Sequence, residues 1–195
     1  MSLAHHFATM ATNNAWANLR LLNACAQLTD EEFQAPRTSF FPSLSATLNH
    51  NYTVDLYYVD ALERWFEGRS PNPDGVAFFA TEVPFPYCAP LLAAQREVDR
   101  RLMTICAGLP DARLSQAVGV GRRTGIVFET ATRLLAHLFQ HQIHHRGQAH
   151  AMLAGTRIKP PQLDDFFCAG DAQARAPELA ALGLTDAEIW NSQGT

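Results

Sequence analysis

Apolar side chains recur every three or four residues in four long segments of the chain, which predicts four amphipathic helices. Residues that favour helix ends bound these segments: Ser2, Ser43 and Thr130 suit N-caps, and Gly68 and Gly155 suit the position after a last turn. The predicted helices cover 3–28, 43–67, 90–107 and 130–154. Four long helices with a mainly polar remainder predict an all-α protein, a four-helix bundle.

The connections refine this picture. Segment 68–90 holds five prolines and is long for a compact domain, so we expect an up-down bundle with one long crossover. Short β-prone runs flank a glycine-bracketed turn in 117–128, which predicts a small β-hairpin before the last long helix. We expect residues 1–160 to form the bundle and residues 161–195 a helical extension packed on it.

Polar residues interrupt the apolar faces at two places. Asn14 falls on the apolar stripe of the first helix, which indicates a buried polar contact. On a helical wheel of 43–67, Asp55 lies on the apolar side, whereas Asn49 and Thr53 fall on the polar face. His50 lies off that polar face.

Composition restricts the function classes. Hydrophobic residues make up 47% and charged residues 17% of the 195 residues, which is typical of a globular chain. The net charge of −4 argues against nucleic-acid binding through a basic face. No stretch of 18 apolar residues and no leader pattern occurs, so we expect a cytoplasmic protein that does not enter a membrane. The four cysteines show no CxxC spacing and are expected to be free thiols.

The histidines are the informative residues. Five of the eight lie between His137 and His150, all on the last predicted helix. His141 and His145 are one turn apart and share a stripe with His137 and apolar residues, so we expect them to face the core. Two imidazoles at this spacing can bind one divalent metal, and His50 is the candidate third ligand. On the residues alone, a metal site and ordinary structural histidines both remain open.

The surroundings of these histidines favour neutral ligands. No Asp or Glu occurs from 130 through 163, so a carboxylate that orients the rings has to come from another helix, and Asp55 is the candidate. The string from His141 to His145 has the spacing of HExxH, but Gln142 stands where that motif carries its general base, which argues against a zincin peptidase. His144 points about 100° away from His145 and is not expected to be a ligand.

Three strings carry a family resemblance: NAWANLRLL at Asn14 to Leu22, TLNH at Thr47 to His50, and HLFQHQIHHRGQAHAML at His137 to Leu153. They resemble the DinB family of bacterial four-helix-bundle proteins. The resemblance implies a divalent metal held by one histidine of the second helix and an HxxxH pair of the last, which fall on His50, His141 and His145. We call these three residues the histidine trio. The resemblance also implies relatives among thiol S-transferases and maleylpyruvate isomerases, in which the metal activates a thiol.

Two functions follow as hypotheses. The first is a metal-dependent enzyme, of S-transferase or hydrolase type, that activates a low-molecular-weight thiol or a water against a small-molecule substrate. The alternative is a non-catalytic metal-binding or stress-response protein. Three imidazoles suit zinc, nickel, copper or iron. Because each imidazole must be neutral to bind a metal, affinity is expected to fall as the pH drops through roughly 6.5.

Two expectations concern surfaces. Gly147 lies inside a helix, which suggests a close approach of another helix, either within the bundle or in a homodimer. The 68–90 connection and the 117–128 hairpin are expected to form the rim of the site.

Overall fold

Four long helices form the bundle in a computed structural model, which describes residues 2–190. They are α1 (Leu3–Cys25), α3 (Leu44–Phe66), α4 (Cys88–Ala107) and α5 (Ala131–Ala154). Helix accounts for 64% of the structure, and the predicted all-α class is confirmed. None of the helices in this part of the chain is long and apolar enough to cross a membrane.

The predicted caps determine where three of the helices begin. The side chains of Ser2, Ser43 and Thr130 each accept a hydrogen bond from a backbone N–H three residues later. Helix α1 ends at Cys25, earlier than expected, because Thr29 and Glu32 form a capping box that starts the short helix α2 (Asp30–Gln34). The chain must leave the first helix to reach that geometry.

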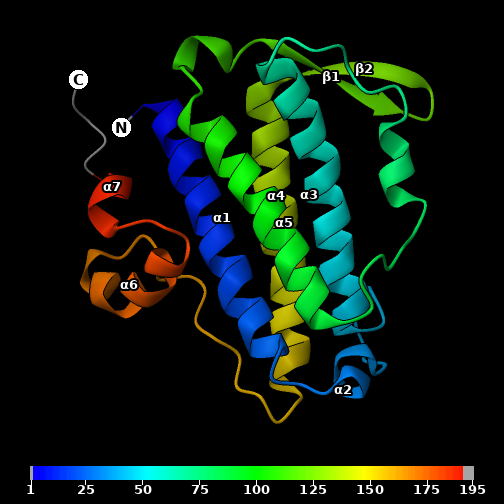
Figure 1. Ribbon diagram of the computed structural model, residues 1–195, viewed down its shortest axis with the longest axis vertical. Coiled ribbons are helices and arrows are strands. Elements are labelled where there is room, and N and C mark those ends of the chain that lie inside the picture. Colours follow the sequence, from blue (N-terminus) through cyan, green and yellow to red (C-terminus); the bar gives the residue numbers. More distant parts are fainter. Residues whose placement is uncertain (1, 191–195) are drawn as a thin grey trace.

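The bundle has the expected long crossover (Figure 1). Helices α1 and α5 run downward in the figure, whereas α3 and α4 both run upward, so the segment between α3 and α4 returns along the length of the molecule. This segment contains the 3₁₀ helix η1 (Gly75–Phe79). Helix α1 packs against α4 and α5, and α3 packs against the same two helices.

The crossover covers part of α3 that was expected to face solvent. Asn49 is 0% and Thr53 4% exposed, so their predicted place on a solvated polar face is wrong. The Asn49 side chain donates through Nδ2 to the Phe85 carbonyl at 2.8 Å and accepts from the Phe85 N–H at 2.9 Å. The Asn49 side chain therefore satisfies both the backbone N–H and the backbone carbonyl of Phe85, which have no neighbouring strand or helix to pair with in the described part of the chain.

The hairpin lies at the upper end of the bundle in Figure 1 and confirms the prediction. Strand β1 (Ala117–Arg122) pairs antiparallel with β2 (Gly125–Thr130). A Cβ atom at Gly121 would collide with the carbonyl oxygen of Asn72, so only glycine lets the crossover approach this strand. Short 3₁₀ helices precede the hairpin and α6: η2 (Asp111–Arg113) and η3 (Ala169–Asp171).

The C-terminal segment packs against α1 through helices α6 (Ala172–Ala181) and α7 (Asp186–Trp190). Trp16 of α1 is fully buried against Phe166, with ring centroids 5.5 Å apart. Arg20 Nε donates to Glu178 Oε1 at 3.0 Å across the same contact. The division of the chain at residue 160 stays a prediction.

Candidate metal centre

The histidine trio converges between α3 and α5. One nitrogen from each ring of His50, His141 and His145 lies within 4.8 Å of the others. The Nε2 atoms of His50 and His141 are 2.9 Å apart, and the three ring centroids are 4.5 to 4.9 Å from one another. A helical spacing of four residues on α5 and one position on α3 thus place three imidazoles around one point.

This geometry suits a divalent metal. Two neutral imidazoles that face each other through Nε2 share at most one proton, whereas a cation accepts a lone pair from each. Zn–N bonds of about 2.0–2.1 Å place tetrahedral ligand nitrogens roughly 3.3 Å apart, which is within the spread of the trio. The nitrogens of the three rings are therefore close enough together to bind one metal ion.

Gln148 orients one of the rings. The Nδ1 atom of His145 lies 2.7 Å from Gln148 Oε1, an acceptor that places the ring proton on Nδ1 and leaves the Nε2 lone pair toward the trio. The expectation that Asp55 would orient the rings is wrong. Asp55 is 0% exposed, and its carboxylate instead accepts a hydrogen bond from Gln95 Nε2 at 2.8 Å.

The site keeps its imidazoles neutral. Burial, with a further contribution from His145, lowers the pKa of His50 to about 4. Burial and then the other histidines lower the pKa of His141 to about 3. Burial also lowers the pKa of His145, against the opposing effect of its hydrogen bond to Gln148. Since no carboxylate contributes to these shifts, the three rings present lone pairs at neutral pH.

Metal affinity should therefore persist to a lower pH than unperturbed imidazoles allow. We expect binding to change little between about pH 8 and pH 6 and to weaken as the pH approaches 4, the pKa of His50, because protons compete only near the pKa of the folded rings. Equilibrium dialysis across this range measures the effect. Loss of half the metal already at pH 6.5, the ordinary histidine pKa, would contradict it.

The same shifts set the sign of a stability effect. Above pH 6.5 the rings are neutral in the folded and unfolded chain alike. Between 6.5 and about 4 the unfolded chain binds protons at His50 that the folded chain does not. The metal-free protein should therefore lose stability as the pH falls through this window.

Two phenylalanines form the neighbouring wall. The Phe41 ring centroid lies 4.4 Å from that of His50 and 5.4 Å from that of His145. Phe40 packs on Phe41 and is 78% exposed. Both belong to the connection between α2 and α3, which the sequence did not single out. Among the described residues, the ring contacts of the trio outside the histidines are to these two side chains, so neither predicted rim segment provides them.

The remaining histidines of α5 lie at the edge. His144 is exposed, as expected, and its ring centroid is 4.8 Å from that of His145. His137 is exposed too, so its predicted orientation toward the core is wrong. Its ring packs on Tyr58, whose hydroxyl accepts a hydrogen bond from Arg122 of the hairpin at 3.3 Å. Among the described residues, the hairpin is thus connected to the histidine trio through Arg122, Tyr58 and His137.

A buried polar layer spans the bundle core beside the trio. Asp99 of α4 accepts hydrogen bonds from Asn14, Asn18 and Gln95 at 3.0 to 3.2 Å. Burial raises the pKa of Asp99, and burial together with Asp99 raises that of Asp55. The side chains of this polar layer come from all four long helices: Asn14, Asn18, Asp55, Gln95, Asp99, Gln142 and Arg146.

Comparisons with known proteins agree with the family resemblance of the sequence. The sequence profile of the DinB superfamily matches residues 12–149. Protein DinB of Bacillus subtilis (strain 168) is 28% identical over 143 residues, which cover 72% of this chain and 80% of that protein. The match includes all three residues of the trio and spans well over half of the sequence. The chain therefore belongs to the DinB superfamily.

Proposed function

We propose that this protein is a metal-dependent enzyme in which His50, His141 and His145 hold a divalent zinc, nickel or iron ion. The convergence of three neutral imidazoles beside an apolar wall carries the proposal. When bound there, the ion would act as a Lewis acid that lowers the pKa of a small thiol or a water. The reaction is of S-transferase or hydrolase type, with a small electrophile as substrate.

The chain supplies the surroundings of this chemistry. Because the three ligands are neutral, they leave the positive charge of the site undiminished, which favours an anionic nucleophile. The rings of Phe40 and Phe41 exclude water from one side and offer an apolar surface to the substrate.

No general base replaces the glutamate of zincin peptidases. Gln142 donates through Nε2 to the Asn51 carbonyl at 3.1 Å in the core and cannot accept a proton from the nucleophile. The titratable side chains in ring contact with the trio are His137 and His144, both exposed. These two imidazoles are the proposed route by which the proton reaches solvent.

Metal analysis and an activity panel test the proposal together. Purified protein is assayed with small electrophiles and with glutathione, cysteine or no added thiol, before chelation, after chelation and after return of zinc, nickel or iron. We expect turnover to disappear on chelation and to return with one metal. Tight metal binding without turnover against any pair would favour the non-catalytic alternative, and turnover that survives chelation would overturn the metal mechanism.

A further inference from the structure

A second cavity lies on the other side of α5 from the trio. It has a volume of about 430 Å³, is open to solvent, and lies between α1, α5 and the segment that follows α5. Most of its walls are apolar and come from Met10, Ile143, Leu163 and Phe167. A concave apolar site of this size suits a small organic molecule.

A buried cation lines this cavity. Arg146 is 5% exposed, and its hydrogen bonds run from Nη1 alone, to the side-chain oxygens of Asn14, Asn18 and Gln142. Within residues 2–190, Nε and Nη2 donate no hydrogen bond, and no carboxylate forms an ion pair with this guanidinium. The buried carboxyl groups of Asp55 and Asp99 act on this guanidinium only through space, so its Nε and Nη2 groups keep unused capacity to pair with a carboxylate.

A second polar group of the lining is also unsatisfied. The Oδ1 atom of Asn13 is buried and has no hydrogen-bond partner among the described residues. By contrast, the Nε2 atom of His150 lies 2.9 Å from the carbonyl oxygen of Pro161, within hydrogen-bond distance. Asp164, the carboxylate among the lining residues, is exposed to solvent and accepts a hydrogen bond from Gln162. The cavity therefore offers one cationic donor, whereas the Asn13 oxygen lies buried behind its wall.

Gly147 keeps the cavity open. A Cβ atom at this position would meet no atom within 4 Å, so the close helix approach expected within the bundle is wrong. Glycine destabilises the interior of a helix, and no steric collision at this position requires it. Because Gly147 lines the cavity, any larger side chain would occupy ligand space.

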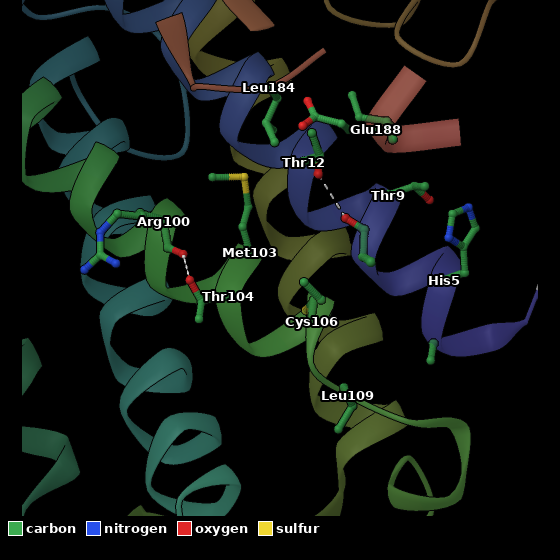
Figure 2. Close-up of a pocket in the computed structure, with 14 residues that line it drawn as sticks. His5, Thr9, Thr12, Arg100, Met103, Thr104, Cys106, Leu109, Leu184 and Glu188 are labelled. Carbon is green, nitrogen blue, oxygen red and sulfur yellow. Dashed lines mark hydrogen bonds between the residues drawn. The ribbon is translucent and has the colours of Figure 1, made fainter. Parts of the chain in front are cut away.

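A larger cavity has no buried cation among the described residues that line it. Figure 2 shows this volume of about 540 Å³ between α1, α4 and the C-terminal turn. Thr12 and Thr104 donate to backbone carbonyls of their own helices at 3.1 and 2.9 Å, and Arg100 is paired with Glu97. These three polar side chains are thus already engaged.

We propose that the cavity beside Gly147 binds a small organic acid with a compact apolar body. The carboxylate accepts from Nε and Nη2 of Arg146. The hydrocarbon part packs on Met10, Ile143 and Phe167. Because Gln142 and Arg146 directly follow His141 and His145, an occupant of this site also stiffens the helix that carries two of the trio.

Calorimetric titration tests this site. The probes are 3-phenylpropionate, indole-3-acetate and 4-methylpentanoate, each paired with its neutral amide. We expect at least one acid to bind the purified protein more than about tenfold tighter than its amide, since only the acid pairs with the guanidinium. The Gly147→Leu variant should lose more than about tenfold in affinity for that acid, keep its metal content and melt at a higher temperature.

The matched control is Ala136→Leu, which adds a similar side chain at an exposed position of the same helix and should leave affinity unchanged. Equal binding by the Gly147→Leu variant would place the acid elsewhere, at the trio included, and would overturn the proposal. The proposal would also be overturned if none of the three acids bound with a Kd below about 1 mM. So would a dimer that Gly147→Leu converts to a monomer, since a second copy would then cover this face. Each outcome can be read whether or not the trio supports catalysis.

Discussion

The His145→Ala variant is expected to lose its metal while the bundle remains folded. His145 supplies one of three converging nitrogens, and Gln148 fixes the direction of its ring. Removing a partner that only orients a ligand costs metal proteins about 10- to 100-fold in affinity, so removing the ligand itself should cost more than about 100-fold. The apolar neighbours of His145 on α5, such as Leu138 and Met152, are untouched and keep the helix in place.

His144→Ala is the matched control. It removes an imidazole from the adjacent, exposed position and should leave metal content near normal. Elemental analysis of both variants, with circular dichroism to verify helix content, measures the difference. If the His145→Ala protein holds no metal and yet keeps full turnover in an assay that the wild type passes, the proposed mechanism is refuted.

The second large effect concerns stability, and Asp99→Ala should produce it. Asp99 accepts the amide N–H groups of Asn14, Asn18 and Gln95 in the polar layer, and it is 2% exposed. Its removal leaves the amides of Asn14 and Asn18 without this acceptor, leaves Gln95 with Asp55 alone, and takes a nearby negative charge away from Arg146. We expect the free energy of unfolding to fall by about 3–5 kcal/mol.

Glu97→Ala on the same helix provides the comparison. Glu97 is exposed and pairs only with Arg100, so its replacement should change stability by less than about 0.5 kcal/mol. Urea denaturation of the two variants measures both values. A loss below about 1 kcal/mol for Asp99→Ala would mean that water reaches the polar layer and satisfies its donors.

The sequence predicted the parts of this molecule that depend on local pattern. The four helices follow from apolar periodicity and caps, because the 3.6-residue period is a property of each segment alone. The trio followed from the spacing of His141 and His145 and from the position of His50 off the polar face of its helix. The structure brings these three rings together.

The errors arose where distant segments meet. Asn49 looks solvated on a wheel, but the crossover covers it and uses its amide as a hydrogen-bond partner. Phe41 lies in a connection without periodicity, so nothing local marks it as a neighbour of His50. Asp55 was predicted correctly to be buried, but the prediction that it contacts the histidine rings is wrong. A single sequence does not show that Gln95 of another helix is its hydrogen-bond partner. Asn14 and Asp55, on the apolar sides of their helices, were the two signs of the polar layer in the sequence.

The polar layer also determines the vertical register of the helices. A bundle held only by apolar side chains can slide one helix past another by a turn, about 5.4 Å, with little change in the area it buries. Here such a slip would separate Asp99 from Asn14 and Asn18, and Arg146 from both amides, and would leave these buried polar groups without hydrogen-bond partners. The same alignment holds α3 level with α5 through the hydrogen bond from Gln142 to the Asn51 carbonyl. Since Asn51 follows His50 and Gln142 follows His141, the layer that prevents slippage also keeps these two imidazoles at one height.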